Sequence, residues 1–240
     1  MKFSVIIPTW NEGPHISHAL KRFREISDSS SLEVILVDGW SADNTVAQAT
    51  PWVDHIKLLE RPNRGAQLHA GAKLATGDLL FFLHADAQPP NKWQEYLEKV
   101  WLTRRRGALA ATVFSIDYGS KLPYRLVAAG QNLRTRLFQV AYGDQGFCTT
   151  PENYEKSGGF PEIPLMEDVE FSRRIRALGR LELLPAPIWP SARRLRKHGA
   201  LWNSVRNRWI SLCYRCGKDP DELWKRYYAQ GSLGSGPRRR

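Results

Sequence analysis

The 240-residue sequence predicts an α/β fold in which helices flank a mostly parallel sheet. Two observations support this prediction. Short apolar runs recur at residues 2–7, 33–37, 55–59 and 79–83, and such runs are typical of strands buried on both faces of a parallel sheet. Helical patterns fill the intervals between the runs, and strand–helix–strand units of this kind join parallel strands through right-handed crossovers.

The helices of the first half have recognisable signals. Apolar residues recur every three or four positions between Ile16 and Ile26, which predicts an amphipathic helix after Pro14. Asp43 and Asn44 are favourable N-cap residues for the helix that follows them. The remaining helices of this half are expected over residues 45–49, 65–75 and 91–106.

The second half is predicted to contain shorter and more mixed elements. Its strands are expected over residues 108–116, 147–149, 182–184 and 188–192. Its helices are expected over residues 121–140, 151–156, 166–178, 201–216 and 221–228. The last ten residues, 231–240, are rich in Gly and Ser, and this composition predicts a disordered tail.

Charge is unevenly distributed along the chain. Residues 1–172 contain 18 Lys+Arg and 20 Asp+Glu, a net charge of −2, whereas residues 173–240 contain 17 and 4, a net charge of +13. Such a cationic region suits a phosphate-bearing substrate, an anionic membrane surface or nucleic acid. Trp202, Trp209 and Trp224 lie in this region at near-helical spacing, and we expect them to pack as core, with contact to anionic lipid as the alternative.

The cysteines and the N-terminal sequence predict a cytoplasmic protein. Three cysteines are too few and too odd in number for a disulfide framework, which indicates a reducing compartment. Cys213 and Cys216 have the spacing of a zinc or redox pair, but with only Cys148 as a further thiol we expect a bystander pair. No run approaches the roughly 18 apolar residues of a membrane span, and no signal-peptide pattern precedes the first strand.

Carboxylates follow three of the predicted strands, at Glu12, Asp38 and Asp86. Because the carboxyl ends of parallel strands meet at one edge of a sheet, where α/β folds bind ligands, these side chains are candidates for a single site. Asp86 could hold a hard divalent cation, and Arg64, before a predicted helix, suits a phosphate. Each of these residues alone is more often a loop cap or a solvated charge; the set favours a site.

Nucleotide-binding motifs of other classes are absent from the sequence. No Gly-x-Gly-x-x-Gly follows the first strand and no Walker A pattern occurs, which disfavours a dinucleotide-binding enzyme and a P-loop NTPase. A nucleotidyltransferase would also need a Gly-rich phosphate loop after the first strand. The cationic region contains no recognised nucleic-acid-binding motif, so we expect no nucleic-acid partner.

The motifs around these residues resemble, in content and order, those of family 2 glycosyltransferases with the GT-A fold. The resemblance extends over roughly residues 3–230 and is strongest in a small bacterial subgroup associated with radical-SAM and selenium-domain proteins and with arsenosugar biosynthesis. The matching segments are Ser4–Glu12, Val37–Thr45, Asn63–Gln67, Leu83–Asp86, Glu167–Asp168 and Ser191–Arg194.

This resemblance implies an inverting transfer of a sugar from a nucleotide diphosphate sugar, with uridine favoured, to an acceptor hydroxyl. Asp168 would be the general base, Glu167 would position it, and Asp86 would bind Mg²⁺ or Mn²⁺ at the diphosphate. Arg194, with Arg193, would clamp the leaving diphosphate. The residues implied in binding the donor nucleotide are Pro8, Thr9, Glu12, Asp38, Arg64 and Arg193.

Two departures from the family pattern bear on the metal and the arginines. His84-Ala85-Asp86 stands where the family has an Asp-x-Asp pair, so His84 or His198 is a possible further metal ligand. Leu195 follows Arg193 and Arg194 where relatives have an Arg-Trp pair, which leaves the alignment of this motif open. Asp144 and Gln145 lie on a Gly-flanked loop and are expected to bind the donor or acceptor sugar, a simple turn being the alternative.

The resemblance also implies a domain organisation. We expect one GT-A domain over residues 1–230, with a nucleotide-sugar-binding half at 1–106, an acceptor and catalytic half at 107–200 and a helical extension at 201–230. Peripheral contact with an anionic inner membrane stays possible. The alternative functions are a nucleotide-sugar-binding protein without turnover and a cationic nucleic-acid-binding protein. The sequence does not indicate the donor sugar, the acceptor or the oligomeric state.

Overall fold

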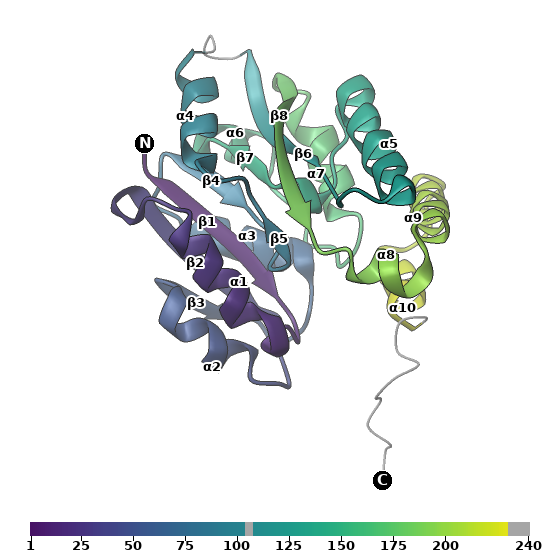
Figure 1. The fold of residues 1–240 in the computed structure, drawn as a ribbon, viewed down its shortest axis with the longest axis horizontal. Helices are drawn as coiled ribbons and strands as arrows, with labels where there is room; N and C mark the ends of the chain where they lie inside the picture. The colour runs from purple at the N-terminus through teal and green to yellow at the C-terminus, as the bar shows by residue number, and fades with distance from the viewer. Residues whose placement is uncertain (104–107, 230–240) are drawn as a thin grey trace.

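The protein is built on one curled sheet, shown in Figure 1. The structure, a computed structural model, describes residues 1–103 and 108–229. Within this part of the chain the sheet has eight strands in the order β3-β2-β1-β4-β7-β6-β8-β5. The tail predicted at 231–240 and the end of the predicted helix 91–106 lie outside the described residues.

The first half of the sheet is parallel, as the apolar runs predict. β1 (Phe3–Thr9) pairs with β2 on one side and with β4 on the other, and β2 pairs with β3. The other strands of this half are β2 (Leu32–Asp38), β3 (His55–Leu58) and β4 (Leu79–Phe82). The connecting helices are α1 (Gly13–Glu25), α2 (Thr45–Ala49) and α3 (Arg64–Leu74).

Beyond β4 the sheet becomes mixed. β7 (Phe147–Thr149) pairs antiparallel with both β4 and β6 (Leu109–Ile116). β8 (Arg180–Pro190) runs parallel to β6 and pairs antiparallel with the two-residue strand β5 (Ala87–Gln88). The mostly parallel sheet is therefore confirmed, and the parallel order is interrupted at β7.

Helices cover both faces of the sheet and extend beyond one end of it (Figure 1). Those of the second half are α4 (Trp93–Thr103), α5 (Leu122–Phe138), α6 (Pro151–Lys156), α7 (Glu167–Ile175), α8 (Arg193–His198), α9 (Ala200–Arg215) and α10 (Pro220–Ala229). Single 3₁₀ turns occur at η1 (Ser29–Ser31), η2 (Thr50–Trp52) and η3 (Gly143–Gln145). The last two helices, α9 and α10, form the C-terminal helical extension expected at residues 201–230.

The prediction of two strands at 182–184 and 188–192 is wrong, because one strand, β8, covers this segment. Pro185 and Pro187 suggest a break, since proline cannot donate a ladder hydrogen bond. The structure accommodates them by a register shift: Phe114 pairs with Leu184, but the next residue, Ser115, pairs with Pro187. Helix α8 was not predicted from the sequence.

The core is divided between the two faces of the sheet, because successive side chains along each strand point to opposite faces. Val5 and Ile7 belong to a cluster with α1 and the buried Trp93 of α4, whereas Ile6 belongs to a second cluster with α3 and Phe171 of α7. This packing fixes the strands, so that the carboxyl ends of β1 and β8 point toward the same end of the molecule as α8 to α10 (Figure 1).

Candidate functional site

Two adjoining cavities lie at the carboxyl ends of the parallel strands. The strand-end cavity, about 290 Å³, is lined by the segment after β1 and by Asn63, Gln67, Trp224 and Tyr228. The helix cavity, about 150 Å³, is lined by η3, by the start of α7 and by polar residues of α5 and α9. Both cavities are lined by Arg64, His84 and Asp86, so the two form one bent crevice whose combined volume is typical of small-molecule sites.

Asp38 is placed behind the wall of the strand-end cavity. Its side chain is almost fully buried, and it accepts hydrogen bonds from the Thr9 hydroxyl at 2.9 Å and from the Ser41 backbone N–H and hydroxyl at 2.8 and 2.6 Å. It lines neither of the two cavities, whereas Thr9 and Pro8 do line one. Asp38 therefore fixes the ends of β1 and β2 relative to each other.

Arg193 joins the other two strand-end carboxylates. Its Nη2 lies 3.1 Å from Glu12 Oε2 and 3.4 Å from Asp86 Oδ2, and its Nε donates to the Ser191 hydroxyl at 3.0 Å. Glu12, Asp86 and Arg193 come from three distant parts of the sequence and meet here because β1, β4 and β8 all end at this edge. The convergence that the strand ends predict is present in the structure for Glu12 and Asp86.

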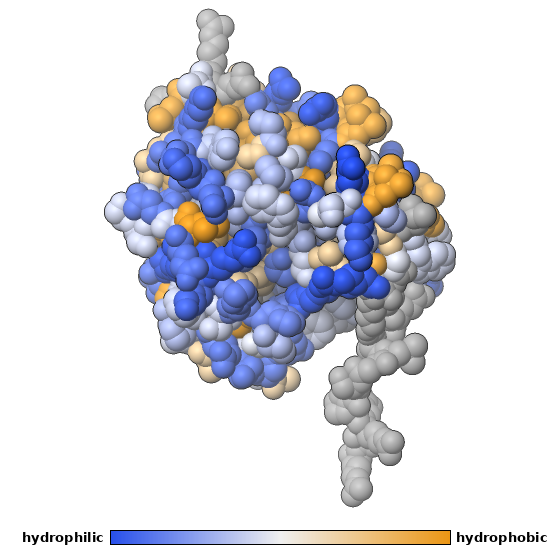
Figure 2. All heavy atoms as spheres, viewed as in Figure 1, coloured by the Kyte–Doolittle hydropathy of each residue, from blue (hydrophilic) through white to orange (hydrophobic). Residues whose placement is uncertain are grey.

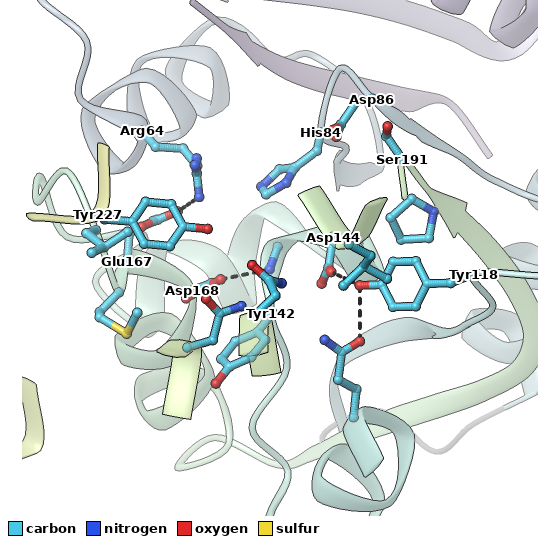
Figure 3. Close-up of a pocket in the computed structure, with 18 residues that line it drawn as sticks. Arg64, His84, Asp86, Tyr118, Tyr142, Asp144, Glu167, Asp168, Ser191 and Tyr227 are labelled. Atoms are coloured by element: carbon cyan, nitrogen blue, oxygen red, sulfur yellow. Dashed lines mark hydrogen bonds and ion pairs between the residues drawn. The ribbon is translucent and has the colours of Figure 1, made fainter. Parts of the chain in front are cut away.

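Arg64 connects the two cavities through an ion pair with Glu167 (Figure 3). It is the first residue of α3, a helix that the Asn63 side chain caps by accepting a hydrogen bond from the Ala66 N–H. Its Nη1 lies 3.1 Å from Glu167 Oε1, and its Nη2 donates to the Tyr228 hydroxyl at 3.2 Å. The carboxylates of Glu167 and Asp168 raise the pKa of Arg64 despite its burial, so the guanidinium stays charged.

Two neighbouring carboxylates begin α7 and face the helix cavity. Glu167 is 1% exposed and Asp168 is 8% exposed. Asp168 Oδ2 accepts a hydrogen bond from the Gly143 N–H at 2.9 Å and Oδ1 from the Val169 N–H at 2.7 Å. Burial raises the pKa of both carboxyls, and the nearby Arg64 opposes this shift.

The 3₁₀ turn η3 places Asp144 against Tyr118 on the opposite wall (Figure 3). The Tyr118 hydroxyl donates to Asp144 Oδ2 at 2.9 Å, and burial raises the pKa of Asp144 to about 6. Gln145 points away into the protein, where it accepts from Thr135 at 2.9 Å and donates to the Phe114 carbonyl at 3.2 Å. Asp144 thus lines the cavity, whereas Gln145 holds the turn in place.

Three oxygen atoms buried in the helix cavity have no hydrogen-bond partner. They are Asp144 Oδ1, Glu167 Oε2 and Asn207 Oδ1, and all three residues line the cavity. Each of these atoms accepts hydrogen bonds and none donates. Since unpaired buried polar groups are costly, this wall is suited to a ligand that carries several hydrogen-bond donors.

The residues of the described chain do not form a closed metal site. Among them no group of three or more His, Cys, Asp or Glu side chains is positioned to hold a metal ion. Asp86 and His84 lie on one loop and line both cavities (Figure 3). The side chains of Arg194 and His198, the other two residues predicted for this region, lie outside the described part of the structure.

Several cavity residues were not predicted from the sequence. Asn203 and Asn207 lie four residues apart on α9, a spacing that puts both on one helix face and could have indicated them. Trp10 packs against Trp224 and Tyr228 of α10, with ring centroids 5.9 and 5.8 Å apart. This contact closes the strand-end cavity and joins residues more than 200 positions apart, so no local pattern could have revealed it.

The prediction that Trp202 and Trp209 pack in the core is wrong. Trp202 is 62% exposed and Trp209 is 48% exposed, because the face of α9 that turns inward carries Asn203, Asn207 and Ile210 instead. Trp224 is partly buried, against Trp10 and not against the sheet. Cys148, Cys213 and Cys216 are free thiols in the structure.

Residues 4–159 match the family model described as Glycosyl transferase family 2. Over 234 residues the chain is 28% identical to the probable glycosyltransferase YdaM of Bacillus subtilis, covering 87% of this chain and 54% of that protein. It is 33% identical to the uncharacterized glycosyltransferase alr2836 of Nostoc sp. over 107 residues, covering 41% of this chain and 32% of that protein. The chain therefore spans about half or less of the length of these two relatives.

Solved structures share the fold. Glucosyl-3-phosphoglycerate synthase from Mycobacterium tuberculosis, in complex with Mn²⁺, UDP and glucosyl-3-phosphoglycerate, has a TM-score of 0.59 at 21% identity, covering 90% of this chain and 80% of that one. Mannosyltransferase PcManGT from Pyrobaculum calidifontis, in complex with GDP-Man and Mn²⁺, has a TM-score of 0.61 at 20% identity, covering 98% and 76%. These likenesses confirm the GT-A-type α/β architecture.

Proposed function

The chain belongs to glycosyl transferase family 2, and from this premise we propose that it is a metal-dependent, inverting glycosyltransferase. It would move a sugar from a nucleoside diphosphate sugar to an acceptor hydroxyl. One observation carries the proposal: two cavities of different character meet at Arg64, His84 and Asp86. A donor with its nucleoside in one cavity and an acceptor in the other would bring the reacting atoms together at this junction.

We assign the strand-end cavity to the donor nucleotide. Trp10 and Trp224 offer aromatic surface, and the polar side chains of Thr9, Glu12 and Asn63 line the cavity where a base and a ribose would lie. The solved relatives support a nucleoside diphosphate, since one is a complex with UDP and another a complex with GDP-Man. We favour a uridine nucleotide. Asp38 would stabilise this cavity through its hydrogen bonds with Thr9 and Ser41 and would not contact the nucleotide itself.

Asp86 would bind Mg²⁺ or Mn²⁺ at the donor diphosphate. A single carboxylate fits a cation of this type, because Mg²⁺ is commonly held by one or two carboxylates together with substrate phosphates. His84 on the same loop is the candidate for a second ligand. When bound, the cation would offset the negative charge that develops on the departing diphosphate.

Arg193 and Arg64 are proposed to hold the diphosphate. Arg193 already lies between Glu12 and Asp86, so a small rotation of its guanidinium would exchange these carboxylates for phosphate oxygens. Arg64 lies at the N-terminus of α3, where backbone N–H groups also favour an anion. Arg194 follows Arg193 in the chain and is proposed to assist in the same task.

Asp168 is proposed as the general base. As the acceptor oxygen bonds to the anomeric carbon and the bond to the diphosphate breaks, Asp168 would take the hydroxyl proton. Its two backbone hydrogen bonds fix its orientation, and each carboxylate oxygen retains a further lone pair. Burial raises the pKa of Asp168, which makes it a stronger base at neutral pH. Glu167, held by Arg64, would position this part of α7.

The helix cavity favours an acceptor that carries several hydroxyl groups and no negative charge. Its unpaired oxygens on Asp144, Glu167 and Asn207 all require donors, and two of them belong to carboxyl groups. A phosphate or carboxylate placed against these carboxyl groups would face like charge. We therefore propose a polyol or an uncharged sugar as the acceptor.

Nucleotide binding and turnover test the proposal separately. We expect a nucleoside diphosphate with Mn²⁺ to raise the melting temperature of the protein, and a panel of nucleotide sugars to identify the donor by the largest shift. Incubation with that donor and a polyol should then yield a product of inverted anomeric configuration, visible by NMR. If no nucleoside diphosphate shifts the melting temperature, with or without metal, the proposed function is wrong.

A sugar-nucleotide-binding protein without turnover is the second candidate, because Asp86 stands alone where the family pattern has two carboxylates. Slow hydrolysis of the donor in a long incubation would exclude it. The motifs also lead us to propose membership of the radical-SAM-associated subgroup, and the free thiols fit the reducing cytoplasm proposed as its location.

A further inference from the structure

Helices α5 and α9 pack against each other and both present an exposed apolar stripe. The side chains of these stripes are between 48% and 66% exposed, whereas apolar side chains of this size are mostly buried in proteins. On α5 they are Leu122, Leu126, Leu133, Leu137 and Phe138. On α9 they are Trp202, Val205, Trp209 and Leu212. We call this surface the α5–α9 face.

The spacing of these residues shows that the α5–α9 face is continuous on each helix. On α9 the intervals of three, four and three residues place all four side chains in one row, and on α5 the leucines are four, seven and four residues apart. Figure 2 shows apolar side chains, in orange, gathered over α5 at the upper right, with hydrophilic side chains in blue between them. Exposed apolar side chains gathered on one surface are typical of interaction sites.

The charge of the α5–α9 face has one sign. Neither helix contains an Asp or a Glu in its sequence, and exposed arginines border the stripes at Arg125, Arg136, Arg208 and Arg215. Within the described part of the chain, none of the four forms an ion pair. Leucine and tryptophan on one face with flanking arginines are the features of helices that lie in the surface of an anionic membrane.

We propose that the α5–α9 face docks the protein peripherally on an anionic lipid bilayer. A second copy of the chain is the less suitable occupant, because a symmetric contact would bring two sets of unpaired arginines together. An anionic bilayer satisfies both features at once, since its acyl region takes the apolar side chains and its headgroups pair with the arginines. None of the described helices is long and apolar enough to cross a membrane, and the proposed contact needs no such helix.

The α5–α9 face lies on the same two helices that supply Gln131, Asn203 and Asn207 to the helix cavity. Docking would therefore hold that cavity close to the bilayer surface. This inference goes beyond the proposed function and does not depend on it, because it concerns where the protein binds and not what it transfers.

Co-sedimentation with lipid vesicles tests the proposal. We expect the full chain to bind vesicles that contain phosphatidylglycerol more tightly than vesicles of phosphatidylcholine alone, and the binding to weaken as salt increases. Trp209→Glu and Leu133→Glu should each weaken binding by roughly tenfold or more, because each puts a negative charge into the apolar stripe. Arg125→Gln and Arg136→Gln should each weaken it by about fivefold.

Leu102→Glu is the matched control. Leu102 is 72% exposed on α4, outside the α5–α9 face, and the same charge change there should leave vesicle binding within twofold of the parent. Melting temperatures close to that of the parent would show that all the variants fold. Equal loss in Leu102→Glu, equal binding to both kinds of vesicle, or no binding to either would overturn the proposal. The proposal would also be overturned if the parent bound no vesicles and instead formed a dimer in sedimentation equilibrium that Trp209→Glu dissociates.

Discussion

The strand-end cavity and the helix cavity share one edge of the sheet but differ in how their polar groups are satisfied. Around the strand-end cavity the charged groups have partners: Arg193 bridges Glu12 and Asp86, which line the cavity, and Asp38 behind the lining accepts from Thr9 and Ser41. In the helix cavity, by contrast, buried acceptor oxygens remain unpaired. The polar groups around the first cavity thus have partners within the protein, whereas the second cavity offers acceptor oxygens to a ligand.

This difference follows from the elements that build each cavity. The strand-end cavity lies on the ends of parallel strands, whose positions are fixed by the ladder and by both core clusters. The helix cavity is enclosed by a 3₁₀ turn and by α5, α7 and α9, which meet through side chains. A rigid wall suits a donor that must be held in one orientation, and an unsatisfied wall selects an acceptor by its hydroxyl groups.

Replacing the proposed base should have the largest effect on activity. It would also distinguish the role of the helix cavity in turnover from that of the strand-end cavity in donor binding. We expect Asp168→Asn to lower turnover by about 10²- to 10⁴-fold, because the acceptor proton loses its base. The rise in melting temperature with nucleoside diphosphate should persist, since the donor binds in the other cavity. Glu170→Gln on the same helix, where Glu170 pairs with Arg173 and Arg174, is the control and should keep most of the activity. Turnover near the parent value in Asp168→Asn would contradict the assignment.

A methyl group at Gly65 tests the contact between the two halves of the chain at the start of α3. A Cβ there would collide with the backbone carbonyl oxygen of Pro161, which has no flexible side chain to yield. We expect Gly65→Ala to lower the free energy of unfolding by about 3 kcal/mol in urea denaturation. Gly130→Ala, within α5 and with 3.9 Å to the Arg208 guanidinium, should instead raise it by about 0.5 kcal/mol. Equal effects at the two positions would show that the contact at Pro161 is not tight.

The ion pair between the cavities can be examined by a double-mutant cycle. Arg64→Met should lower the free energy of unfolding by about 2 kcal/mol, because it leaves the buried Glu167 carboxylate without its partner. Glu167→Gln in the same chain should recover part of this loss, since a neutral amide needs no counter-charge. If the loss in the free energy of unfolding of the double variant equalled the sum of the losses of the two single variants, the pair would not couple the cavities.

The smallest expected effect concerns the pH dependence that Asp144 contributes. Its pKa in the folded protein, about 6, lies above its ordinary value of 3.8, so the folded state binds more protons between these two values. The stability that Asp144 contributes is therefore complete below about pH 4 and is lost as the pH rises through 6.

Denaturation at several pH values measures this contribution. Between pH 4 and pH 7 the parent should lose on the order of 1 kcal/mol more stability than Asp144→Asn does. The control is Leu102→Asn, an exposed position on α4 that has no titratable side chain, which should retain the full pH dependence of the parent. A parent and an Asp144→Asn variant with the same pH profile would show that the helix cavity is less enclosed than its geometry indicates.

Local sequence patterns are sufficient to predict the parallel half of the sheet and the residues at its strand ends. Apolar runs and helical spacing are local patterns, and a polar residue at the carboxyl end of a buried strand lies at the sheet edge. This is why Glu12, Asp38 and Asp86 are predicted together. Four of the six family motifs lie in these segments, whereas Glu167–Asp168 begins α7 and Ser191–Arg194 follows β8.

Which side chains face the cavities and which face solvent depends on contacts between distant parts of the chain. Asp38 lies at the end of a strand as Asp86 does, yet three hydrogen bonds hold its side chain away from the cavity. Trp202 and Asn203 are adjacent in α9, but packing against α5 turns the asparagine inward and leaves the tryptophan exposed. Such choices depend on contacts between residues far apart in the chain, and no local pattern encodes them.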